Sequence, residues 1–399
     1  MLKRFIQAWE LRLSKVDRHR HASPFAWGVE HLTAHAEHLD VPLSAADFPD
    51  PPAFLREYAR RTLPASERFF TPPPLTDWHL HDGWLTFPSS IQTPDEPNNL
   101  AWARYFPVRE RWGATTRPPV VLVLPQWNAD YASHVSVCRG LNAFGIAAVR
   151  LSLPYHGSRR PVHQVRADYM VSPNIGRTIQ AVRQAVHEVR LVLDWLESQG
   201  YTRFGIIGTS IGSCVAFLAY VFDPRLQVAA FNHVSSYFAD VVWTGISTSH
   251  VRAGLEHHVT RYDLRDYWLP ISPFPYIERL GRPENRHKKT LLIAARYDMT
   301  FLPHLTRHAM SEFERHRAPY KSAWMYCGHY TTGETPFKFH DGYLMIDHMR
   351  KHLNPGGHVV RRALQSQLPA VLRPRARTLR PSALLPNDEG IYRGASPPH

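Results

Sequence analysis

The chain has 399 residues, of which 44% are hydrophobic and 20% charged, a composition typical of a folded protein with a large core. Its 47 lysines and arginines against 34 acidic residues give a formal net charge of +13, and many of the basic residues lie near the two ends. No nucleic-acid-binding motif accompanies this charge, so we expect no specific nucleic-acid partner, and weak peripheral membrane contact through the basic ends stays as an alternative.

The cysteines Cys138, Cys214 and Cys327 occur without a C-x-x-C pair, which indicates reduced thiols. The basic, amphipathic N-terminus lacks the uninterrupted apolar stretch of a signal peptide. No segment approaches the ~20 apolar residues that are needed to cross a bilayer. We therefore expect a cytoplasmic protein, while the sequence specifies no oligomeric state.

Residues 1–75 are predicted to form an N-terminal accessory segment, with a helix over 2–16 followed by proline-rich turns. From residue 76 the pattern changes to strands separated by helices. The apolar runs at 119–125 and 145–154 have the β-branched composition of buried parallel strands, and residues 131–144 between them fit a crossover helix. Two further strands are expected at 82–89 and 100–108.

The longest expected helix has the clearest pattern. Ser172 and Pro173 suit an N-cap and a first-turn proline, and apolar residues then recur at steps of four and three from Ile175 to Leu196. Gly200 suits a left-handed helix end. The remaining elements are helices at 211–222 and 337–353 and strands at 203–207, 228–234, 290–295 and 322–328. This alternation predicts one α/β domain over 76–353 with a doubly wound, mostly parallel sheet.

Two stretches depart from the alternation. Residues 235–288 are rich in Trp, Tyr, His and Pro, and they are too long for an ordinary connection between core strands, so we expect a lid. Residues 354–399 are rich in Arg and Pro with few large apolar side chains, and they are predicted to be a disordered tail.

The stretch Gly208-Thr209-Ser210-Ile211-Gly212 places one serine at the corner between an apolar strand and an apolar helix. A nucleophile at such a corner has strained backbone angles, and side chains two positions away on either side would collide, so glycine is needed at both. The helix that starts at Ile211 directs its positive end toward Ser210. The pattern therefore indicates a serine presented for chemistry.

With two further segments, the sequence resembles the α/β-hydrolase family, in its branch of serine esterases and dienelactone hydrolases. The resemblance covers about residues 78–353 and rests on "GTSIG", on "LLIAARYDMTFLP" and on "AWMYCGHYTTG". In the second segment a strand is followed by Asp298, and in the third a strand is followed by His329. Ser210, Asp298 and His329 thus occur in the family's chain order of nucleophile, acid and base.

The resemblance implies a catalytic role for each of these residues. His329 would take the proton of Ser210, and Asp298 would orient the imidazole and stabilise its cation. An oxyanion hole would need the backbone N–H of Ile211 and a second donor from the loop after strand 119–125, for which Trp127 is preferred and Gln126 comes next. This loop lacks the His-Gly of many relatives.

Other candidate residues have weaker signals. His233, His156 and Asn128 lie near expected strand ends and are assigned to the substrate pocket, although a structural role is the simpler interpretation of the two histidines. His79, His81 and the pair His257-His258 come without further ligands at metal-site spacing, so we expect no metal. No nucleotide-binding motif is present, and we expect no cofactor.

Together these features predict a carboxylesterase-like serine hydrolase that cleaves a small-molecule carboxylic ester or thioester through an acyl-enzyme. An acyltransferase or peptidase using the same triad, or a non-catalytic binding protein with this fold, are the alternatives. We expect removal of residues 1–20 or 360–399 to leave catalysis intact.

Overall fold

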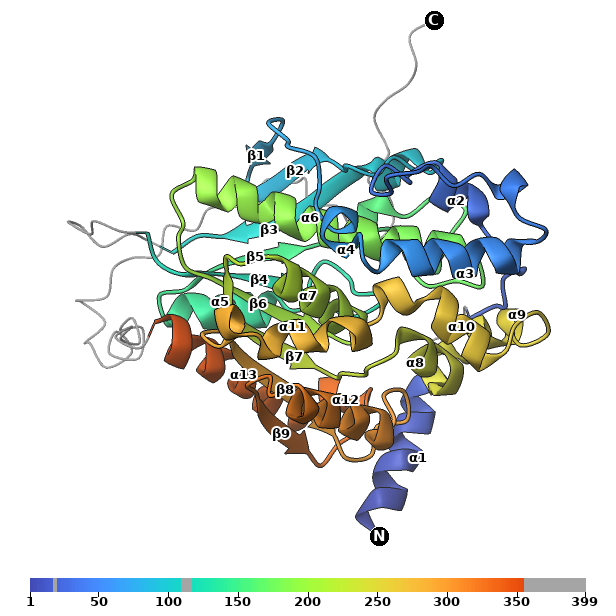
Figure 1. Cartoon of the computed structure of the whole chain (residues 1–399). Coiled ribbons are helices and arrows are strands. Elements are labelled where there is room, and N and C mark those ends of the chain that lie inside the picture. The colour runs from blue at the N-terminus through green and yellow to red at the C-terminus, as the bar shows by residue number, and fades with distance from the viewer. Residues whose placement is uncertain (17–19, 109–116, 355–399) are drawn as a thin grey trace, which may run out of the picture. The chain divides into compact units, whose positions relative to one another are not determined.

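The computed structural model describes residues 1–16, 20–108 and 117–354, and these contain one nine-stranded sheet (Figure 1). Its strands are β1 (His79–His81), β2 (Trp84–Pro88), β3 (Leu100–Phe106), β4 (Val120–Leu124), β5 (Ala147–Leu151), β6 (Phe204–Thr209), β7 (Leu226–Asn232), β8 (Lys289–Ala295) and β9 (Lys321–Met325). The order across the sheet is β1-β2-β3-β5-β4-β6-β7-β8-β9. The neighbouring strands from β5 to β9 in this order are all parallel. The remaining three pairs, β1 with β2, β2 with β3 and β3 with β5, are antiparallel. The mostly parallel sheet predicted from the sequence is therefore confirmed.

Helices cover both faces of this sheet. The α-helices of the described residues are α1 (Leu2–Ser14), α2 (Val29–Thr33), α3 (Pro51–Thr62), α4 (Ser66–Phe69), α5 (Val135–Ala143), α6 (Ile175–Ser198), α7 (Ile211–Phe222), α8 (Phe238–Thr244), α9 (Ser249–Leu255), α10 (Arg261–Tyr267), α11 (Ile277–Gly281), α12 (Pro303–Arg315) and α13 (Phe337–Leu353). Of these, α5 and α13 pack on one face, and α6 and α7 pack on the other.

Side chains alternate between the two faces along the central strands, so the sheet separates two apolar cores. On β4, Leu122 belongs to the larger core together with residues of α6 and α7, whereas its neighbours Val121 and Val123 belong to the smaller core together with residues of α5 and α13. All five residues of β4 are buried, as expected for a strand covered on both faces.

Some element ends differ from the sequence prediction. Asn174 caps α6, because its side chain accepts a hydrogen bond from the N–H of Arg177, and the helix begins two residues after Pro173. Ser172, which the sequence predicted as the cap, lies two residues before Asn174. Gly200 follows the helix at φ +85°, in the left-handed conformation expected of it.

Residues of the N-terminal segment share the main core with the sheet. Phe54 and Tyr58 of α3, and Phe69 and Phe70 at the end of α4, are fully buried in the same apolar cluster as β4 and α6. Helix α1 instead contacts the short helix η8 (Thr331–Gly333), which follows β9 in the chain. Except for Asn354, the tail predicted at 354–399 lies outside the described residues.

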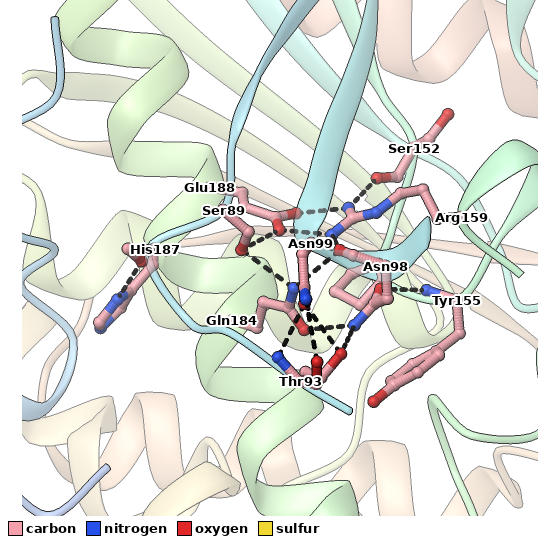
Figure 2. A network of polar contacts seen from close by, with 12 residues as sticks. Ser89, Thr93, Asn98, Asn99, Ser152, Tyr155, Arg159, Gln184, His187 and Glu188 are labelled. Carbon is pink, nitrogen blue, oxygen red and sulfur yellow. Dashed lines mark hydrogen bonds and ion pairs between the residues drawn. The ribbon is translucent and has the colours of Figure 1, made fainter. Parts of the chain in front are cut away.

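A buried ion pair connects three segments of the chain (Figure 2). Arg159 donates two hydrogen bonds of 2.6 Å to the carboxylate of Glu188 on α6, and both side chains are completely buried. Ser89 also donates to Glu188 (2.8 Å), and Arg159 donates to the carbonyl of Asn98 (2.8 Å). The network therefore anchors the loop after β5, and the loop between β2 and β3, on α6.

Within the described residues, no helix is both long enough and apolar enough to cross a membrane.

Candidate active site

The strand-to-helix corner between β6 and α7 presents Ser210. Its backbone has φ 56° and ψ −120°, a strained combination for a residue with a side chain. A Cβ atom on Gly208 would lie 2.2 Å from the carbonyl oxygen of Gly212, and one on Gly212 would lie 2.5 Å from the carbonyl oxygens of Leu124 and Pro125. The two glycines are therefore required by the close approach of β6, α7 and the end of β4.

Ser210, His329 and Asp298 come together at the carboxyl ends of parallel strands. The Oγ atom of Ser210 lies 3.2 Å from Nε2 of His329, and Nδ1 of His329 lies 3.4 Å from Oδ2 of Asp298. Ser210 and Asp298 are buried and His329 is partly exposed, so the imidazole connects the buried carboxylate to the hydroxyl. The contacts have the order that proton transfer from the serine requires.

Backbone groups hold Asp298 in place. Its Oδ1 atom accepts hydrogen bonds from the N–H groups of Thr300 (2.7 Å) and Phe301 (2.8 Å), which leaves Oδ2 to face the imidazoles. Burial alone would raise the pKa of Asp298, but the charge of His329 and the hydrogen bonds to His233 and His329 outweigh burial and hold this pKa below its usual range. Asp298 is therefore a carboxylate at neutral pH.

A second imidazole shares this carboxylate. Nδ1 of His233, the residue after β7, lies 2.8 Å from Oδ2 of Asp298, and its ring centre lies 4.5 Å from that of His329. Burial, and then the charge of His329, lower the pKa of His233. The sequence predicted His233 in the substrate pocket; in the structure it lines one of the cavities beside Ser210 and also lies beside Asp298. Its position at the end of the strand between the serine and acid strands was the available signal.

Ligand atoms of His233, Asp298 and His329 lie within 4.8 Å of one another, a spacing at which three such groups could hold a metal ion. Sequence spacing missed this set, because the three residues follow three different strands. The expectation of no metal was drawn from linear spacing and did not consider it.

The loop after β4 is held by His156. Nε2 of His156 accepts a hydrogen bond from the backbone N–H of Asn128 (2.9 Å), while Nδ1 lies 2.8 Å from the carbonyl oxygen of Pro154. Burial lowers the pKa of His156 to about 4, so the ring is neutral at pH 7, with its proton on Nδ1 and Nε2 free to accept. His156 was also predicted for the substrate pocket, but it is not among the residues that line the two described cavities beside Ser210.

This arrangement limits the choice of oxyanion donors. The N–H of Asn128 is occupied by His156, whereas the N–H groups of Ile211 and Trp127 make no backbone hydrogen bond within the described residues. Trp127 lines both cavities beside Ser210, and Gln126 and Asn128 line only one of them. Of the two residues predicted as the second donor, only Trp127 lines both cavities.

Two cavities of opposite character meet at Ser210. One is apolar and extends between α7, α12 and the 235–288 segment; its walls include Ile211, Phe217, Phe238, Val242, Ala309 and Phe313. The other is polar and contains His329; its walls include Asn128, His134, Arg166, Asn232, Lys338 and Asp341. The 235–288 segment, expected to be a lid, supplies walls of the apolar cavity.

One residue near the site had no signal in the sequence. Glu10, on α1, is fully buried and accepts hydrogen bonds from the backbone N–H groups of Tyr330 and Thr331, directly after His329.

Known proteins share this architecture. Residues 91–265 match the family model described as "Alpha/beta hydrolase domain containing 18". The acylaminoacyl peptidase of Pyrococcus horikoshii is similar with a TM-score of 0.51 and 14% identity, over 70% of this chain and 42% of that one. This chain therefore spans less than half of the peptidase's length.

Two acetyl xylan esterases are similar along nearly their whole length. Acetyl xylan esterase 1 from Thermoanaerobacterium sp. JW/SL YS485 has a TM-score of 0.53 and 12% identity, over 75% of this chain and 99% of that one. The enzyme from Paenibacillus sp. R4 has a TM-score of 0.51 and 14% identity, over 78% and 97%. At these identities the similarity shows the fold. The sheet and these similarities confirm the α/β-hydrolase fold that the sequence predicted, and residues 91–265 match an α/β-hydrolase family model.

Proposed function

We propose that this protein is a serine hydrolase that cleaves a carboxylic ester or thioester of a small molecule through an acyl-enzyme. The observation that carries the proposal is the continuous contact from Ser210 to His329 to Asp298, at a point where two cavities meet. The fold supports a hydrolase in general, and this contact supports serine chemistry in particular.

In the first half-reaction, Oγ of Ser210 attacks the carbonyl carbon while Nε2 of His329 takes the hydroxyl proton. The negative charge that develops on the carbonyl oxygen is stabilised by the N–H groups of Ile211 and Trp127. When the tetrahedral intermediate collapses, the bond to the alcohol or thiol breaks, and His329 gives the proton to this leaving group. Asp298 stabilises the imidazolium throughout.

In the second half-reaction, a water molecule gives a proton to His329 and attacks the acyl carbon. The bond from this carbon to Oγ of Ser210 then breaks, the proton returns to Ser210, and the carboxylic acid leaves. Each half-reaction restores the charge state of the triad. An acyltransferase or peptidase would follow the same steps with another acceptor or an amine leaving group, so these activities are the alternatives to test.

The two cavities suit different parts of such a substrate. The apolar cavity suits the acyl chain, because burying its methylene groups is favourable by about 0.8 kcal/mol each. The polar cavity, with the basic side chains of Arg166 and Lys338 in its wall, suits a polar alcohol or thiol portion.

The test is hydrolysis of p-nitrophenyl esters of increasing acyl length, together with covalent labelling by a fluorophosphonate. We expect turnover and one labelled site, and Ser210→Ala should abolish both. Ser198→Ala, which changes an exposed serine at the end of α6 away from both cavities, is the matched control and should retain both. A wild-type chain that neither turns over esters nor becomes labelled would support a non-catalytic binding protein instead.

A further inference from the structure

Helix α1 buries one side against the loop of residues 328–331, and its other residues are exposed or partly exposed. Ile6 and Glu10 are its only fully buried residues, whereas the side chain of Phe5, next to Ile6, is 62% exposed. These two residues lie four positions apart and therefore share one side of the helix. The contact surface of α1 thus includes a charged side chain where an apolar one would be usual.

Both carboxylate oxygens of Glu10 are used by the loop that carries His329. Oε2 accepts a hydrogen bond from the N–H of Tyr330 (3.0 Å), and Oε1 accepts one from the N–H of Thr331 (2.6 Å). On the other side of His329, a Cβ atom on Gly328 would lie 2.4 Å from Cδ of Glu10, so glycine is needed there for the carboxylate to fit. Glu10 therefore contacts the chain on both sides of His329.

We propose that Glu10 is a positioning residue of the active site, which fixes the 328–331 loop and thereby holds the imidazole of His329 between Ser210 and Asp298. This inference rests on the proposed function. It reverses the expectation that residues 1–20 are dispensable for catalysis.

A carboxylate is suited to this task because it can accept from two neighbouring N–H groups at once, and hydrogen bonds to a charged acceptor are roughly twice as strong as neutral ones. Burying a carboxylate away from water is costly. In the described part of the chain Glu10 forms no ion pair, so backbone N–H groups are the partners that offset this cost. Its charge also favours the protonated form of the nearby His233 imidazole. The same charge would stabilise the imidazolium that forms on His329 during catalysis.

A second contact extends the N-terminal anchor. The guanidinium of Arg20 donates to the hydroxyl of Tyr330 and to the carbonyl oxygen of Ile246 (3.2 Å), which lies in the 235–288 segment. Glu10 and Arg20 therefore both contact the segment that begins at His329, and Arg20 contacts the 235–288 segment as well.

The experiment compares three full-length variants with the wild type. Glu10→Gln keeps the size of the side chain but places an NH2 group against a backbone N–H. Glu10→Asp keeps the charge, and Arg12→Gln changes an exposed residue on the same helix as the control. For each we would measure kcat and KM with a p-nitrophenyl ester, the fraction of Ser210 titrated by a fluorophosphonate, and the melting temperature.

We expect Glu10→Gln to lower kcat per titrated serine by roughly 10- to 100-fold with KM changed less than about 2-fold, because the imidazole is misplaced while the cavities are intact. Glu10→Asp should retain more activity than Glu10→Gln, and Arg12→Gln should match the wild type. A wild-type kcat per titrated serine in Glu10→Gln would overturn the inference, and so would a loss confined to the titrated fraction.

Failure of the proposed function has a different signature. If the wild-type chain itself is inert toward esters and fluorophosphonate, the proposed function fails, and the crystal structures of the wild type and Glu10→Gln test the positioning role alone. A 328–331 loop and a distance from Ser210 Oγ to His329 Nε2 that are unchanged in Glu10→Gln would then overturn it, whereas a displaced imidazole would support it.

Discussion

At the scale of single residues, side chains that bond to backbone amides hold the loops around Ser210, Asp298 and His329. His156 holds the N–H of Asn128, and Glu10 holds those of Tyr330 and Thr331. The first contact shapes the loop that would bind the oxyanion, and the second shapes the loop that carries the base. A buried side chain that satisfies backbone N–H groups next to a reacting residue can therefore affect catalysis without touching substrate.

Asp341, on α13, makes the folding free energy depend on pH. Its Oδ2 atom accepts a hydrogen bond from Asn232 (2.9 Å), but burial outweighs this bond and raises the pKa of Asp341 from 3.8 to about 7. Between these two values the folded state keeps a proton that the unfolded state releases. Stability is therefore lost as the pH rises through this window, at a rate approaching ~1.4 kcal/mol per pH unit.

Asp341→Asn cannot ionise and should escape this loss. We expect the free energy of unfolding of the variant, relative to the wild type, to rise from about pH 4 to about pH 7 and then stay constant. Urea unfolding at several pH values measures it. Asp347→Asn on the same helix is the control of opposite sign, because the hydrogen bond from Lys351 outweighs burial and lowers the pKa of Asp347, so this variant should lose stability at pH 7. A pH-independent difference for Asp341→Asn would contradict the assignment.

That Ser210, Asp298 and His329 come together could be predicted from the sequence, because each lies shortly after a recognisable strand and Ser210 has a glycine two positions away on either side. The roles of His233 and His156 could not, because they depend on which segments lie next to each other in space. Glu10 had no signal at all. A glutamate on an amphipathic helix is ordinarily solvated, and only the docking of α1 on the His329 loop buries it.

At the scale of elements, helix α12 forms one wall of the apolar cavity through Ala309 and Phe313. The other walls come from α7 and from the 235–288 segment. Because Ala309 has the smallest of these side chains, the length of acyl chain that the cavity accepts should depend on the size of the residue at this position.

Ala309→Phe should therefore shorten the preferred acyl chain. We expect kcat/KM for octanoyl esters to fall by at least about 10-fold, with acetyl esters within about 2-fold of the wild type, because the added ring occupies space that several methylene groups would fill. Ser311→Ala, an exposed change on the same helix, is the control. Equal losses for short and long esters, at an unchanged melting temperature, would show that the apolar cavity does not receive the acyl chain.

Local sequence patterns are not sufficient to predict where a helix begins. The apolar stripe of α6 was visible in the sequence, but its start was not, since Ser172, Pro173 and Asn174 are all plausible near a helix start. The tertiary structure determines which of these residues is the cap. Asn174 pairs with Ala26 in an isolated β-bridge, and its side chain caps the helix. That choice depends on a segment almost 150 residues earlier.

At the scale of the whole molecule, strand order was the part of the fold that periodicity could not supply. Strand β3 precedes β4 in the chain but pairs with β5, and the antiparallel strands β1 to β3 form one edge of the sheet. Hydrophobic runs identify strands without identifying neighbours, so the arrangement was implied by the family resemblance alone. The ion pair of Arg159 and Glu188, which fastens two loops to α6, was likewise invisible before folding.

This ion pair makes the last prediction possible. Removing one partner of a completely buried pair leaves an uncompensated charge, which typically costs ~3–5 kcal/mol, whereas replacing both partners by apolar residues is much less costly. We expect Glu188→Leu to lower the free energy of unfolding by about this amount, and Arg159→Met combined with Glu188→Leu to recover part of it. Recovery stays partial because the hydroxyl of Ser89 loses its acceptor and the carbonyls of Ser152 and Asn98 each lose a donor.

Urea unfolding measures the free energy of unfolding of the wild type, the single variant and the double variant. Glu256→Leu is the control, because it breaks the exposed ion pair with Arg252 and should lower this free energy by less than ~1 kcal/mol. The loop held by Arg159 also contains His156, which in turn holds Asn128. Glu188→Leu should therefore lower kcat at temperatures where the variant is still folded. If the single and double variants are equally destabilised, the cost comes from lost packing around α6 and not from a stranded charge.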